Sequence, residues 1–144
     1  VYRQSFLGQA RSTFWRMSRE GGLQRNAENF TLSGPGKFYS TNAKNETVQF
    51  EISGSNDVNY IANSGTTYPL SNQVKTSASV FRYYTSSNDE IALTSGQTLT
   101  QTTASTVQLL YLDMYFKRDD DSIRLSSYIY PQNFRYGKKM SYHD

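Results

Sequence analysis

The sequence predicts an α+β fold in which an N-terminal helix packs on an antiparallel β-sheet of about six to seven strands. Residues 1–22 alone carry apolar residues at helical spacing, whereas the rest of the chain alternates at a period of two or collects turn residues. The length of 144 residues suits one domain with one core. We therefore expect a single domain over 1–144, made of the helix at 1–22, a β-domain at 23–131 and a basic, partly disordered tail at 132–144.

The predicted helix has an apolar side and a basic side. Its apolar stripe, at spacings of three and four, consists of Leu7, Ala10, Phe14 and Met17. The opposite side carries Arg3, Arg11, Arg16 and Arg19. We expect the stripe to pack on the sheet. A double glycine at 21–22 should end the helix, because glycine costs about 1 kcal/mol in a helix interior and suits the left-handed C-terminal cap.

Two strands in the first half of the β-domain form a predicted hairpin. Val48–Ile52 alternates apolar and polar residues, which is typical of a half-buried strand. Val58–Ile61 returns after a turn rich in Gly, Ser, Asn and Asp. A further short strand is expected at Phe30–Leu32, and loops are expected at 37–45 and 63–72.

The second half contains the longest predicted strand, Thr106–Lys117. One face of it carries Leu110, Leu112, Met114 and Phe116, and the other carries Val107, Leu109, Tyr111 and Tyr115. Because both faces are apolar, we expect this strand at the centre of a covered sheet, beneath the helix. Neighbouring strands are expected at Ser79–Thr85 and Ile123–Tyr130, with a short one at Glu90–Thr94 and a mobile loop at 95–105.

The residues that usually carry catalysis are scarce. The chain contains no cysteine and a single histidine, His143. It therefore has no thiolate nucleophile, no disulfide and no Cys/His zinc site. No GxSxG, P-loop or GxGxxG pattern occurs. We expect neither enzymatic activity nor a cofactor.

The acidic run at 119–121 contains the candidates for metal binding, Asp119 and Asp121. Their carboxylates are oxygen ligands of the kind that calcium prefers. The run falls at a predicted hairpin tip, where aspartate is a common turn residue. It also lacks the spaced acidic pattern of a calcium-binding loop. We favour the turn and predict no metal site.

Basic residues concentrate near the two ends of the chain. The net charge is +3, and residues 1–25 contain five arginines and one glutamate. A second cluster, Arg135, Lys138 and Lys139, is interleaved with aromatic residues, a pattern also found in nucleic-acid-binding proteins. For the helix we favour a solvated basic face, and DNA binding is the alternative.

Several segments together resemble a known family. Gln9–Glu20 is similar to the end of the N-terminal helix of minor pilins and pseudopilins, in particular the J-type pseudopilins of type II secretion and related minor type IV pilins. Val48–Ile52 is similar to their first-hairpin strand and Val80–Tyr84 to a later strand. Thr106–Leu112 with Tyr130–Arg135 resembles their closing hairpin, although this chain has Gln-Asn where an Arg-Asn pair is common.

The resemblance implies a non-catalytic subunit that acts in the initiation or tip assembly of a type IV pilus or a type II secretion pseudopilus. It implies a hydrophobic half-helix upstream of Val1, processed by prepilin peptidase and anchored in a bacterial inner membrane, with the domain in the periplasm or an extracellular filament. The expected partners are other minor pilins or pseudopilins and the major pilin, with the four helix arginines toward them. A DNA-binding or adhesive minor pilin, used in DNA uptake or surface attachment, is the alternative.

Overall fold

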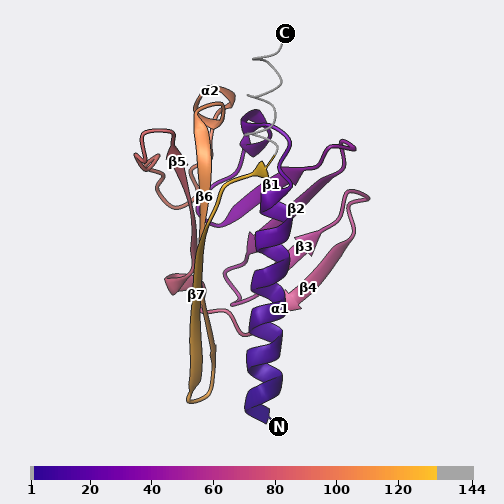
Figure 1. Cartoon of the computed structure of the whole chain (residues 1–144). Helices are drawn as coiled ribbons and strands as arrows, with labels where there is room; N and C mark the ends of the chain where they lie inside the picture. The colour runs from indigo at the N-terminus through magenta and orange to yellow at the C-terminus, as the bar shows by residue number, and fades with distance from the viewer. Residues whose placement is uncertain (1, 133–144) are drawn as a thin grey trace.

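The computed structural model describes residues 2–132, with side chains from Ser5 onward, and contains one long helix and two antiparallel sheets (Figure 1). The helical segments are α1 (Tyr2–Gly22), η1 (Ala27–Phe30), η2 (Thr76–Ala78) and α2 (Gln101–Ala104). The strands are β1 (Lys37–Thr41), β2 (Thr47–Ile52), β3 (Val58–Ile61), β4 (Thr67–Ser71), β5 (Val80–Thr85), β6 (Val107–Arg118) and β7 (Asp121–Ile129). Strands β1-β2-β3-β4 form sheet A, and β5-β6-β7 form sheet B. The predicted α+β class is confirmed, but the expectation of a single sheet is wrong.

The chain crosses from sheet A to sheet B between β4 and β5. Strand β4 is an edge strand, and its Pro69 has no N–H to donate to a further strand. Beyond β4, Val74 N–H donates to Asn56 O at 3.1 Å and Lys75 N–H donates to Tyr115 O at 2.8 Å. The connecting segment therefore bonds to the β2–β3 turn and to β6, and it ties the two sheets together.

Sheet A contains two strands in segments that were expected to be loops. The predicted hairpin is present as β2 and β3, and in β2 the residues Val48, Phe50 and Ile52 are buried. Strands β1 and β4 occupy the segments 37–45 and 63–72, so the loop prediction is wrong there. Phe38 of β1 stacks on Phe50 of β2, with ring centroids 5.1 Å apart. This cross-strand aromatic packing stabilises β1, whose own sequence is too polar to indicate a strand.

Sheet B is built around the long strand β6. Leu110, Leu112, Met114 and Phe116 are fully buried, as their alternation predicts. The opposite face is only half-buried at Leu109, Tyr111 and Tyr115, so the expectation of cover on both faces is wrong. In β7, Ile129 is buried and Ile123 and Leu125 pack partly buried against the core. Glu90–Thr94 does not form the predicted strand, since only an isolated bridge joins Glu90 to Tyr84.

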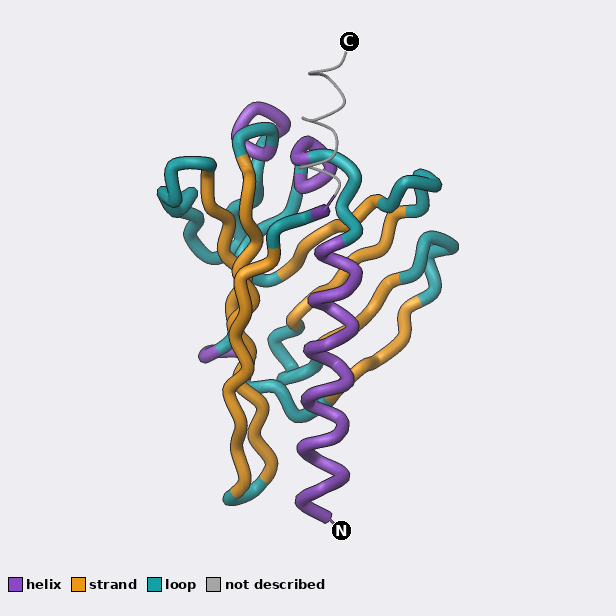
Figure 2. The backbone as a smooth tube through the Cα atoms, in the orientation of Figure 1, coloured by secondary structure: helices purple, strands orange, loops and turns teal. Residues whose placement is uncertain are grey.

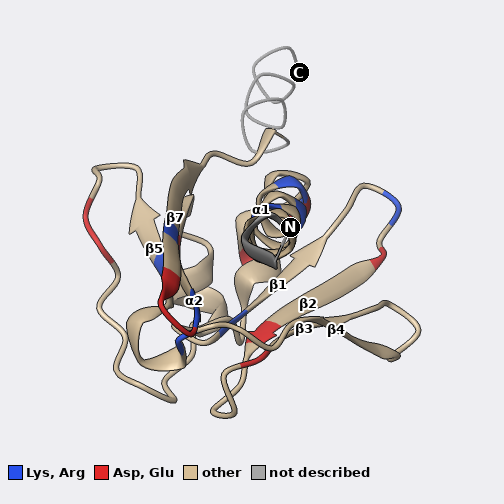
Figure 3. Cartoon of the chain, turned by 90° about the horizontal axis from the view of Figure 1, so that it is seen from below, with Lys and Arg blue, Asp and Glu red and all other residues tan. Residues whose placement is uncertain are grey.

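Helix α1 lies across the inner faces of both sheets, as the end-on view shows (Figure 3). Its most buried side chains are Phe6, Ala10, Thr13 and Met17, which recur at spacings of four, three and four. Leu7 and Phe14 are partly buried and pack against the same core. Each large apolar side chain buried in this way contributes about 1.5–3 kcal/mol. A single hydrophobic cluster therefore joins the helix to both sheets.

The double glycine lies within α1, and it does not form a left-handed cap. In the described residues the glycines with positive φ are Gly65 and Gly96. A Cβ on Gly21 would lie 3.0 Å from Leu110 Cδ2, whereas one on Gly22 would have Ile129 Cγ2 at 3.8 Å as its nearest neighbour. Gly21 therefore allows close approach of the helix to β6, and the capping prediction is wrong.

Two connections are more ordered than the sequence indicates. Phe30–Leu32 is not a strand: Phe30 ends η1, is fully buried and meets Tyr83 edge-on with ring centroids 5.7 Å apart. Within the predicted mobile loop 95–105, Leu99 is buried and short helix α2 forms (Figure 2). Leu99 N–H donates to Ser33 O at 2.8 Å and its carbonyl accepts from Leu32 N–H at 2.9 Å. This segment packs on η1 because its backbone bonds to the η1–β1 connection.

Candidate functional site

The outer side of α1 is the first candidate surface. Trp15 lies opposite the buried stripe and is 62% exposed, an unusual position for the only tryptophan of the chain. The Arg19 guanidinium lies over the indole ring, 5.5 Å from its centroid, and Arg11 and Ser12 are exposed beside it. We name Arg11, Ser12, Trp15 and Arg19 the outer helix face.

The four arginines expected to face neighbouring subunits do not form one group. Arg11 and Arg19 belong to the outer helix face. Arg16 instead places its guanidinium over the ring of Tyr60 in β3, 4.2 Å from the centroid, so it binds the chain's own sheet. The side chain of Arg3 lies outside the described residues. Sequence reasoning did not include Trp15 among the candidate residues, although a large apolar residue on the basic side of a helix is a usable signal.

The C-terminal end of α1 is anchored to β1 by buried polar side chains. Gln24, fully buried, donates from Nε2 to Tyr39 O at 2.7 Å and accepts at Oε1 from Thr41 N–H at 2.6 Å. Ser40 Oγ donates to the Glu20 carbonyl at 2.5 Å, and the same carbonyl accepts from Leu23 N–H at 3.1 Å. These bonds fix the angle between α1 and sheet A and thereby orient the outer helix face.

Tyr83 joins sheet B to the start of sheet A. Its side chain is fully buried, and its hydroxyl contacts two carbonyl oxygens, Gly34 O at 2.9 Å and Lys37 O at 3.1 Å. Burial raises the pKa of this hydroxyl well above its usual value, and the side chain of Ser33 partly offsets the effect. The hydroxyl therefore stays protonated and serves as a structural donor.

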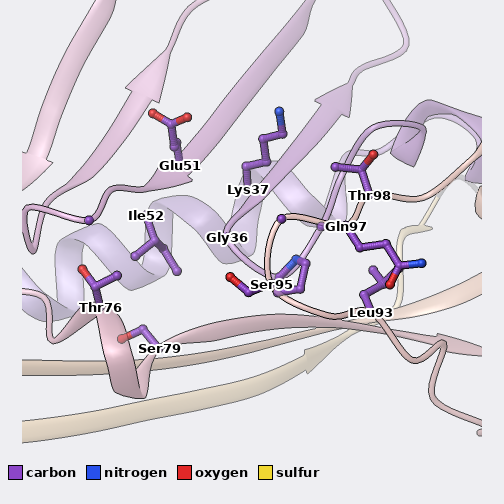
Figure 4. Close-up of a pocket in the computed structure, with 14 residues that line it drawn as sticks. Gly36, Lys37, Glu51, Ile52, Thr76, Ser79, Leu93, Ser95, Gln97 and Thr98 are labelled. Atoms are coloured by element: carbon purple, nitrogen blue, oxygen red, sulfur yellow. The ribbon is translucent and has the colours of Figure 1, made fainter.

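A cavity of about 570 Å³ is lined by the start of β1, the end of β2 and residues from the segment 93–98 (Figure 4). Lys37 and Glu51, directly paired in the β1–β2 register, lie on one side of it, and Thr76 and Ser79 lie on the other. The Thr76 hydroxyl donates to Ser53 O at 2.6 Å, and Ser79 Oγ accepts from Tyr115 N–H at 2.9 Å. Backbone groups therefore engage the hydroxyls of Thr76 and Ser79, and the described lining contains no histidine beside them.

The residues predicted for metal or nucleic-acid binding do not form a site within the part of the chain that the structure describes. Asp119 and Asp121 lie at the β6–β7 turn, where Asp119 takes a left-handed φ of 53° and acts as a turn residue. Within residues 5–132 no three His, Cys, Asp or Glu side chains are grouped as metal ligands would be. Every buried side-chain nitrogen or oxygen of this part of the chain has a hydrogen-bond partner. Arg135, Lys138 and Lys139, proposed for nucleic acid, lie outside the described residues, as does His143.

Comparisons with known proteins found no relative. No protein-family model, no curated protein and no solved structure matches the chain. Across the residues that the structure describes, no helix combines the length and hydrophobicity of a membrane span.

Proposed function

We propose that the chain is a non-catalytic, minor-pilin-like subunit of a type IV pilus or a type II secretion pseudopilus, which acts in filament initiation or tip assembly. The observation that carries the proposal is the division of α1 into two faces. One face is packed into the chain's own core, and the opposite one exposes Trp15 with Arg11 and Arg19 beside it. A long N-terminal helix with this division can pack on its own sheets and on a neighbouring helix at the same time.

The energetics favour Trp15 as the centre of such a contact. Tryptophan and arginine dominate the binding energy of protein interfaces, and single residues of this kind contribute 2 kcal/mol or more. The buried bonds of Gln24 and Ser40 hold α1 in a fixed orientation, so docking requires little ordering of the helix. The neighbouring subunit would therefore meet a preformed surface.

The test is photo-crosslinking in the cell envelope of the source organism, with a photoreactive residue at position 15. We expect the crosslinked partner to be another helix-first subunit of the same filament, identified by its peptides. Trp15→Glu should weaken co-assembly about 30-fold or more and leave the melting temperature unchanged, because the side chain is not part of the core.

The matched control is Leu32→Glu, which adds the same charge at a residue that is 56% exposed and belongs to the η1–β1 connection rather than to α1. It should assemble as the wild type does. If Trp15→Glu also assembles normally, or if crosslinks form equally at position 32, the assembly role of this helix face is wrong.

A further inference from the structure

The outer edge of β7 is a sheet margin to which no other described segment is hydrogen-bonded. On the opposite side of β6, Lys75 N–H donates to Tyr115 O and Lys117 N–H donates to Gln73 O, both at 2.8 Å. In antiparallel pairs the bonded positions alternate, so every second residue of β7 bonds to β6 and the others direct their backbone groups outward. The outward residues, which pair with odd-numbered residues of β6, are Ser122, Arg124, Ser126 and Tyr128.

The backbone groups along this edge are available to a further strand. Of those of the four outward residues, the described part of the chain offers a partner to one, the carbonyl of Tyr128, which accepts from Ser127 Oγ at 3.3 Å. No bulge interrupts the register with β6, and β7 contains no proline. Bulges and prolines are common protections of an exposed edge. The edge of β7 is therefore long, regular and open.

At each of the other three sheet margins the chain itself supplies hydrogen-bond partners. Along β1 the partner is the side chain of Gln24. Along β5, Phe81 N–H donates to Pro35 O at 2.9 Å. Along β4, the Leu70 carbonyl accepts from Thr13 Oγ1 at 3.3 Å. Within residues 5–132 the edge of β7 is thus the exception, and the chain continues directly beyond it.

Apolar side chains beside this edge are incompletely buried. Ile123 and Leu125 of β7 pack against the core from the inner side of sheet B, where α1 lies beside the strand, and both remain partly exposed. A further strand with apolar residues on its inner side would remove more of their surface from water, which is favourable. The edge therefore fits a strand that alternates apolar and polar residues.

The segment that follows β7 has this alternation in its sequence. Residues 133–144 lie outside the described part of the chain, and they outnumber the nine residues of β7. Apolar residues at alternate positions are typical of a half-buried strand, and Lys138 interrupts the series once. The alternating apolar residues are Phe134, Tyr136, Met140 and Tyr142, and those between them include Arg135, Gly137, Lys139 and Ser141.

We propose that residues 134–142 bind the outer edge of β7 as a fourth, antiparallel strand of sheet B. An antiparallel return needs only a short turn, and Pro131, which has no N–H, suits the connection after Ile129. The aromatic residues then face the inner side with Ile123 and Leu125, and Arg135 and Lys139 face solvent. Sheet B would have no open edge, which protects the chain from edge-to-edge aggregation. This inference is independent of the assembly role.

Amide hydrogen exchange in the full chain, followed residue by residue by NMR, tests whether the edge is covered. If it is covered, the N–H groups of Arg124 and Ser126 should exchange within about 10-fold of the rate of Leu125, whose N–H bonds to β6. Much faster exchange at Arg124 and Ser126 than at Leu125 would overturn the proposal.

Two full-length double variants test whether the tail is the occupant. Tyr136→Asp with Met140→Asp places two charges on the inner side of the proposed strand and should accelerate exchange at Arg124 at least about 10-fold. The matched control, Gly137→Asp with Ser141→Asp, adds the same charge on the solvent side and should keep the exchange slow. Equal effects of the two double variants would contradict the proposal.

The backbone of the edge is tested with Ser126→Pro, which removes an outward N–H and leaves the bonds to β6 in place. Its control is Ser126→Ala, because both changes remove the hydroxyl bond to Asp113. Trypsin cleavage after Arg135, Lys138 and Lys139 should be about 10-fold faster in the proline variant, with cleavage within residues 5–132 unchanged. Equal cleavage of the tail in both variants would count against the added strand.

Other occupants of the edge give different results. Slow exchange at Arg124 that appears only at high protein concentration would show that β7 pairs with a second copy of the chain. Slow exchange that persists at every concentration in the Tyr136→Asp, Met140→Asp variant would show that another segment covers the edge. Either result overturns the proposal for the tail.

Discussion

At the scale of the residue, Gly21 and Gly22 are neighbours with opposite roles. A side chain at position 21 would press on Leu110 at 3.0 Å, whereas position 22 has no atom closer than 3.8 Å. We expect Gly21→Val to lower the free energy of unfolding by about 1–3 kcal/mol through overpacking. Gly22→Ala should raise it by about 0.5–1 kcal/mol, because alanine is the better helix former. Urea unfolding measures both, and equal effects of the two changes would contradict the close approach of α1 to β6.

Tyr83 makes stability depend on alkaline pH. Because the folded state raises the pKa of its hydroxyl, this contribution is complete below about pH 10, the value in an unfolded chain, and is lost as pH rises above it. At pH 7 we expect Tyr83→Phe to cost about 1–3 kcal/mol, since the buried Gly34 carbonyl loses its hydroxyl donor, whereas the Lys37 carbonyl still accepts from Gly34 N–H. The difference from the wild type should shrink above pH 10. A difference that is constant from pH 7 to pH 11 would show that the hydroxyl is not held protonated.

At the scale of the element, Gln24 takes the place of a strand beside β1. Its amide donates to Tyr39 O and accepts from Thr41 N–H, as a neighbouring strand would. We expect Gln24→Glu to destabilise the fold by about 2 kcal/mol at pH 7, because a carboxylate cannot donate to Tyr39 O. Below about pH 4 the protonated carboxyl regains a donor, so part of the loss should be recovered relative to Gln24→Ala. Identical pH profiles of the two variants in thermal unfolding would contradict this geometry.

The elements that sequence reasoning located are those whose own residues carry the pattern. In β2 and β6 the alternation is strong, and both strands lie where they were predicted. In β1 and β4 the pattern is too polar, and cross-strand contacts such as Phe38 with Phe50 decide the structure. The α2 segment forms through local bonds, with Thr100 Oγ1 accepting from Thr103 N–H at 3.2 Å. Because a composition rich in Ser and Thr is typical of loops, it does not reveal such capping bonds.

At the scale of the whole molecule, the split into two sheets depends on contacts between distant segments. No local pattern shows that β4 ends one sheet and β5 begins another, because the decision involves Val74 and Lys75 bonding to residues far along the chain. The candidate surfaces also depend on contacts between distant segments. The apolar and basic sides of α1 could be predicted from spacing, but the contact of Arg16 with Tyr60 and the packing of the Tyr111 ring against Tyr128 exist only after folding. Local periodicity does not contain them.

The backbone groups on the outer edge of β1 are already hydrogen-bonded, which limits how copies of this chain can join. In many β-proteins an open edge accepts a strand from another molecule, which leads to strand exchange or to fibrous stacking. Here the outward groups of Tyr39 and Thr41 are occupied by Gln24, Ser33 and Arg25, and the far margin of the same sheet includes Pro69. A polymer containing this chain would then be held together by side-chain surfaces rather than by a shared backbone ladder across β1. Such joints can form and separate without any strand being pulled out of the fold.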